Sequence, residues 1–209
     1  MNSAMSSAMN RVRALSAIAL FSLASCAILG KGEPVVPRYF TPMESNAAPM
    51  AAQPKRPELH LRLGRIEGLS HLREPMVIRA TPQELTYDES RRWTERPEVY
   101  LRESLTAALF QQRGITEVIA GPAVRLDAEL TAFEEIAQPQ DRVRLAITWL
   151  LHDDRAAIMQ DTIALEVPIA ADTANEEKAQ AVVDAYAKAL RDGVAQLADR
   201  VETKLSEAR

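Results

Sequence analysis

The stretch VRLDAELTAF, residues 124–133, decides the fold class of this 209-residue chain. Its apolar and polar residues alternate throughout, which is the pattern of a strand with one buried face. Two more strands are predicted after it, at residues 143–151 (VRLAITWLL) and 158–167. The short polar sequence HDDR between these two predicts a hairpin turn. Strands joined in this way favour an antiparallel sheet.

Shorter alternating stretches come before this region, and two helical patterns flank its strands. The shorter stretches predict strands at 59–66, 76–80, 84–87 and 115–120. One helix is expected from Pro97, which suits a first helical turn, to Gly114. A second follows Thr173 and Glu176, which have capping-box spacing, and carries an apolar stripe to Leu205. We therefore expect an α+β two-layer sandwich, with a mostly antiparallel sheet of about six strands covered by two helices.

The N-terminal residues have the organisation of an export signal. Arg11 and Arg13 precede the apolar run ALSAIALFSLA (residues 14–24), which is too short to span a bilayer. The only cysteine of the chain, Cys26, follows Leu23, Ala24 and Ser25. This sequence resembles the bacterial lipobox, in which the cysteine is acylated and the preceding peptide is removed. The alternative is a plain secretory signal with a cysteine there by chance.

The lipobox interpretation divides the chain into three parts. Residues 1–25 are the signal peptide, 26–57 a proline-rich flexible tether, and 58–209 the folded domain. Within the tether, Tyr39 and Phe40 either dock on the domain or are stray aromatics. Ala27 after the cysteine favours the periplasmic face of the outer membrane over the inner membrane, by the sorting rule of enterobacterial lipoproteins.

Composition and motifs exclude several classes of function. Removing residues 1–25 changes the formal net charge from −4 to −6, which with no basic run argues against nucleic-acid binding. No nucleophile elbow, P-loop, dinucleotide turn or zinc helix occurs, so we expect neither catalysis nor a metal or cofactor. The three histidines, His60, His71 and His152, are interpreted as ordinary surface or strand-edge residues. Glu134 and Glu135 are interpreted as a solvated strand end.

Two tryptophans remain to be explained. Trp149 lies within a predicted strand and is expected in the core. Trp93 follows Arg91 and Arg92 just before the first helix. Two alternatives are open for it: a structural plug at the start of the helix, or a partner contact shared with Arg91 and Arg92, since tryptophan is enriched at interface hot spots.

The order of these motifs resembles a known family. Residues 68–79 (GLSHLREPMVIR), ELTY (84–87), RRWTE (91–95) and a leucine-rich helix are similar to the auxiliary lipoproteins of ABC-type transport systems, typified by the lipoprotein of the paraquat-inducible operon. The long alternating strand, the strand containing Trp149 and the C-terminal helix follow in the family's order. Arg96-Pro97 departs from the family pattern at the start of the first helix.

The resemblance implies a function that composition does not. Such lipoproteins accompany an ABC permease, an ATPase and a mammalian-cell-entry (MCE) domain protein that forms a lipid conduit across the periplasm. This chain would then be a non-enzymatic, lipid-anchored accessory protein that docks the conduit at the outer membrane. The alternatives are a stand-alone carrier with an acyl chain held near Trp149, and an outer-membrane assembly factor. The apolar stripe of the last helix is either consumed by the sheet or leaves an edge for homo-oligomer formation.

Overall fold

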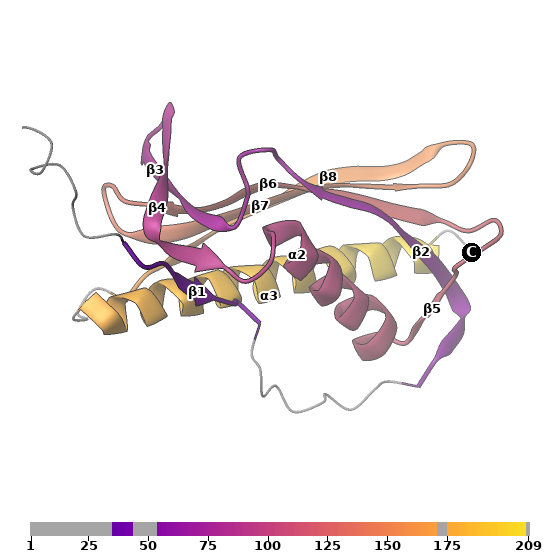
Figure 1. The fold of residues 1–209 in the computed structure, drawn as a ribbon. Helices are drawn as coiled ribbons and strands as arrows, with labels where there is room; N and C mark the ends of the chain where they lie inside the picture. Colours follow the sequence, from indigo (N-terminus) through magenta and orange to yellow (C-terminus); the bar gives the residue numbers. More distant parts are fainter. Residues whose placement is uncertain (1–34, 44–53, 171–174, 208–209) are drawn as a thin grey trace, which may run out of the picture. The chain divides into compact units, whose positions relative to one another are not determined.

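The computed structural model of the chain describes residues 35–43, 54–170 and 175–207 (Figure 1). Contacts divide the chain into the units Met1–Val36 and Pro37–Arg209, and the fold is that of the second unit. The predicted capping residue Thr173 and the lipobox lie outside the described residues. The described elements are β1 (Arg38–Phe40), β2 (Arg56–Gly68), β3 (Pro75–Thr81), β4 (Glu84–Trp93), α2 (Pro97–Thr106), the π-helical turn η2 (Ala107–Gln112), β5 (Ile115–Glu117), β6 (Arg125–Ile136), β7 (Arg142–His152), β8 (Ala157–Pro168) and α3 (Asn175–Glu207).

Strand β6, which contains most of the stretch 124–133, organises the sheet. It pairs with β7 in an antiparallel ladder along its whole length, and β7 pairs with β8 in the same way. On its other edge, β6 pairs in parallel first with β2 and then with β3. Strand β4 is antiparallel to β3, whereas β1 and β5 run parallel to β4 and β2. The α+β fold with two helices is confirmed; the described sheet has eight strands, and its long ladders are the antiparallel ones.

The predicted hairpin between β7 and β8 is confirmed, and Asp153 shapes its turn. Its carboxylate accepts hydrogen bonds from the backbone N–H groups of Arg155 and Ala156, at 2.7 and 2.8 Å. These two N–H groups lower the pKa of Asp153 below its usual value. These local hydrogen bonds satisfy backbone N–H groups that have no partner across the sheet, and they stabilise the turn between β7 and β8.

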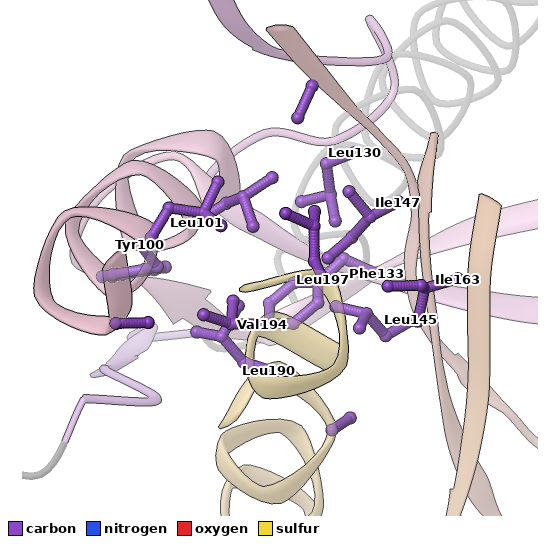
Figure 2. Close-up of a cluster of buried hydrophobic side chains, with 14 of the residues drawn as sticks. Tyr100, Leu101, Leu130, Phe133, Leu145, Ile147, Ile163, Leu190, Val194 and Leu197 are labelled. Carbon is purple, nitrogen blue, oxygen red and sulfur yellow. The ribbon is translucent and has the colours of Figure 1, made fainter. Parts of the chain in front are cut away.

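Helix α3 packs along β7 and β8 and buries its apolar stripe there. Figure 2 shows Leu197 of this helix close to side chains of the sheet such as Phe133, whereas Leu190 and Val194 lie on its side toward α2. The whole predicted stripe is buried: Ala179, Val183, Tyr186, Leu190, Val194, Leu197, Val201 and Leu205. The stripe is therefore buried within the fold and leaves no apolar edge for homo-oligomer formation among these residues. No helix in the described ranges is long and apolar enough to cross a membrane.

The first predicted helix is also confirmed, including its start at Pro97 despite the departure from the family pattern. Pro97 occupies the first turn, where the N–H that proline lacks would have no intrahelical partner. Tyr100 and Leu101 are buried beneath the helix. The last turn widens to the π-helical η2, and Gly114 follows it with a φ of 66°, a conformation that suits glycine.

The tether prediction is wrong for residues 37–43, and β2 already begins at Arg56. Strand β1 lies along β4, where Phe40 opposes Trp93 in the ladder (Figure 1). Phe40 and Met43 are partly buried against the core. The docked alternative therefore holds for Phe40, while Tyr39 stays 62% exposed. The physical reason is that edge strand β4 offers backbone hydrogen-bonding groups that a three-residue strand can satisfy.

Candidate functional site

Trp93 is a core residue, and its burial contradicts the predicted partner contact. Only 1% of the residue is exposed. Its ring lies 4.8 Å from Tyr186 of α3, 5.3 Å from Phe133 of β6 and 6.1 Å from Tyr100 of α2, measured between centroids. The four rings join both helices to the sheet where β4 ends. Trp93 is thus the structural plug at the start of α2, because it lies on the face of β4 that packs against α3.

Arg91, the second predicted contact residue, ties β4 to β6. Its guanidinium donates to Asp88 Oδ2 and to Glu135 Oε2, each at 2.7 Å. Burial by itself lowers the pKa of Arg91, but the two carboxylates outweigh it and raise the pKa. Burial likewise would raise the pKa of Asp88, yet hydrogen bonds from Arg91 and Ser90 hold it below its usual value. This guanidinium is therefore engaged inside the fold.

Glu134 and Glu135 are buried, so their interpretation as a solvated strand end is wrong. Glu134 is fully buried, and Arg79 of β3 donates two hydrogen bonds to its carboxylate, at 2.6 and 2.9 Å. These bonds raise the pKa of Arg79. Adjacent residues on a strand face opposite sides of the sheet, so Glu135 points to the other face and meets Arg91. Sequence spacing gave no sign of these pairs, because β3 and β4 reach β6 only in the folded sheet.

The open edge of the sheet at β1 carries two further arginines, Arg38 and Arg92. Arg38 opposes Arg91 in the ladder, and Tyr39 opposes Arg92. The Arg38 guanidinium lies over the Phe40 ring, 5.3 Å from its centroid, and Arg92 Nε is buried with no hydrogen-bond partner among the described residues. A hollow of about 260 Å³ opens here, lined by Arg38, Ser90, Arg91, Glu135, Lys178 and Ala179. Arg92, the third predicted contact residue, thus borders a basic edge.

A second hollow lies between the two helices and is mostly apolar. Its volume is about 380 Å³, and Met43 borders it opposite Leu190 and Val194 of α3. Trp149 does not line it: this residue is only 1% exposed and belongs to the core, as predicted. A further hollow of about 330 Å³ does touch Trp149, but six of its nine lining residues are charged or polar, unlike those of the apolar groove between the helices. The groove is open and at the small end for a ligand pocket.

The histidines do not form a centre. His60 is exposed, whereas His152 Nε2 lies 3.0 Å from Asp127 Oδ2 at the end of the sheet. His71 Nε2 is buried in the β2–β3 connection and has no hydrogen-bond partner in the part of the chain that the structure describes. Within the described ranges, no group of three or more His, Cys, Asp or Glu side chains could hold a metal ion.

With this geometry in place, comparison with known proteins decides the family. The family described as ABC-type transport auxiliary lipoprotein component matches residues 43–202. The chain belongs to this family. The match begins at Met43, three residues after the end of β1, and ends within α3. It therefore covers nearly all of the folded unit, and it makes the chain an auxiliary lipoprotein of an ABC-type transport system.

Solved structures support the same fold for this auxiliary lipoprotein. A Xanthomonas campestris protein of family DUF330 is similar with a TM-score of 0.64 and 18% identity, covering 75% of this chain and 94% of that one. A second structure, of an uncharacterized protein, has a TM-score of 0.60 and 16% identity over 79% and 99% of the two chains. At these identities the likeness concerns the fold alone. No curated protein matches the sequence.

Proposed function

We propose that this auxiliary lipoprotein is the non-enzymatic, membrane-anchored partner of an MCE-type ABC transport system, and that it docks the lipid conduit at the outer membrane. The family match over residues 43–202 carries the proposal. The domain adds support through its construction: its buried carboxylates Glu134 and Glu135 are paired with Arg79 and Arg91, and both of its tryptophans fill the core.

Cys26 is the proposed attachment point for acyl chains, with Leu23, Ala24 and Ser25 as the recognition sequence before it. Two or more chains hold a protein stably on a membrane, whereas one chain binds only marginally. Cys26→Ser should therefore release the protein from the membrane and abolish its transport phenotype, while the domain stays folded. A soluble Cys26→Ser variant with full transport activity would overturn the proposal.

The partner is tested by mild crosslinking in native membranes, affinity capture of the tagged full chain, and mass spectrometry. We expect an MCE-domain protein together with a permease or ATPase. The matched control is the Cys26→Ser chain, which should lose these partners at the same expression level. Capture of lipid without such proteins would instead favour a stand-alone carrier. Separating inner from outer membranes in the same preparation tests the proposed location.

A further inference from the structure

The chain enters the folded unit at β1, which limits how far this edge of the sheet can lie from the proposed membrane anchor. From Cys26 to Pro37 there are eleven residues, which reach at most about 40 Å when fully extended. A 33-residue helix such as α3 is about 50 Å long. Because β1 is docked on β4, the β1 edge can lie no farther than about 40 Å from the anchor.

The same edge carries charge that the fold leaves without carboxylate partners. Among the described residues, Arg38 and Arg92 form no ion pair, whereas Arg91 and Lys178 are held by Glu135 and Asp141. Without residues 1–25 the chain has a formal net charge of −6. An anionic membrane surface therefore repels the domain as a whole. Only a local basic edge can turn toward such a surface favourably.

Exposed aromatic side chains occur on the same two strands. Tyr39 of β1 is 62% exposed, and Tyr87 of β4 is 47% exposed. Tyrosine beside arginine suits the boundary between headgroups and acyl chains, where an apolar ring and a polar tip are both satisfied. The hollow beside Arg38 adds space at this edge for a phosphate-sized group.

We propose that this basic edge, formed by Arg38 on one face of the sheet and by Tyr39 and Arg92 on the other, meets the membrane surface edge-on and binds the phosphate headgroups of anionic phospholipids. The inference depends on the proposed acylation of Cys26 and adds the face of the domain that meets the bilayer. The partner proteins then meet surfaces away from β1, such as the end of the domain that carries the β5–β6 connection (Figure 1).

Photocrosslinking of the full chain in native membranes tests this orientation. Benzoylphenylalanine replaces Tyr39 in one protein and Ile119, which is 89% exposed in the β5–β6 connection, in the control. We expect phospholipid adducts, identified by peptide mass, at position 39 in at least about fivefold excess over position 119, the factor that one basic residue contributes near an anionic surface. Arg38→Glu should reduce the adduct at position 39 by a similar factor, whereas Arg155→Glu in the β7–β8 turn should leave it unchanged.

Two kinds of result would overturn the inference. One refutes only the orientation of the domain, and the other also refutes the proposed lipid anchor. A membrane-bound chain with equal lipid adducts at both positions, or with protein adducts in place of lipid at position 39, overturns the orientation alone. Absence of the chain from the membrane fraction overturns the anchor as well, and with it the proposed function. A thermal melt of Arg38→Glu that matches the parent shows that a lower adduct yield does not come from unfolding.

Discussion

Replacing Arg79 by methionine removes both hydrogen bonds that the buried Glu134 carboxylate accepts from it, at 2.6 and 2.9 Å. Glu134 has no exposed side-chain surface, so water cannot take the place of the guanidinium without a rearrangement. A hydrogen bond to a charged group contributes about 1.5–3 kcal/mol, and breaking a buried ion pair costs about 3–5 kcal/mol. We expect Arg79→Met to lower the free energy of unfolding by about 3–5 kcal/mol.

The two partners differ in exposure, which predicts an asymmetry. The Arg79 side chain is 24% exposed and can turn toward water when its partner is lost. Glu134→Gln should therefore cost less stability than Arg79→Met, because it leaves a charge that water can still reach. In the double variant Arg79→Met/Glu134→Met no charge is stranded, and it should be more stable than Arg79→Met alone.

Urea unfolding followed by tryptophan fluorescence measures these effects, since Trp93 and Trp149 are both buried. With a slope of about 2 kcal/mol per molar urea, the loss in Arg79→Met corresponds to a midpoint lower by about 1.5–2.5 M. The matched control is Arg65→Met, which breaks an exposed pair with Glu67 and should cost about 1 kcal/mol at most. An Arg79→Met loss as small as that of Arg65→Met would refute the reasoning.

Three further predictions concern the core and the sheet. Trp93→Ala should cost about 3–5 kcal/mol in urea unfolding, whereas Trp93→Phe should keep partner capture intact; loss of capture with normal stability would restore the contact interpretation. Because the pKa of Asp88 is lowered in the fold, its contribution to stability is present above the unfolded pKa of about 3.9 and is lost as the pH falls through the folded value. By urea titration, Asp88→Asn should thus be less stable than the parent at pH 7, and the difference should shrink as the pH falls below about 3.9; a difference that stays constant with pH would contradict this. Gly193→Ala should lower the melting temperature despite the better helix propensity of alanine, since its Cβ would lie 2.3 Å from Leu145 Cδ2; an increase would show that this buried leucine can move.

Much of the secondary structure could be predicted from the sequence because it depends on short-range periodicity. Alternation in 124–133 and 143–151 places one face of each strand inward, and the stripe from Ala179 to Leu205 predicts one buried helix face. The start of α2 at Pro97 follows from proline's missing N–H. Each of these features is set within a few residues of itself.

The candidate site required the tertiary structure, because its residues come from distant strands. Arg79 and Glu134 are 55 residues apart, and Arg91 and Glu135 are 44 apart. The residues next to Glu134 and Glu135 in the sequence do not show whether this acidic pair is solvated or buried. That depends on which strands lie beside β6 in the folded sheet. The docking of β1 on β4 has the same origin.

The sequence by itself therefore determined the two helices, the alternating strands and the family resemblance that the match over residues 43–202 confirmed. The tertiary structure alone decided the parallel pairing of β2 and β3 with β6, the burial of Trp93 and of both glutamates, and the shortened tether. Periodicity specifies which side of a segment is apolar. Which segment covers that side depends on pairing between residues far apart in the chain, where backbone groups and buried charges find partners only on folding.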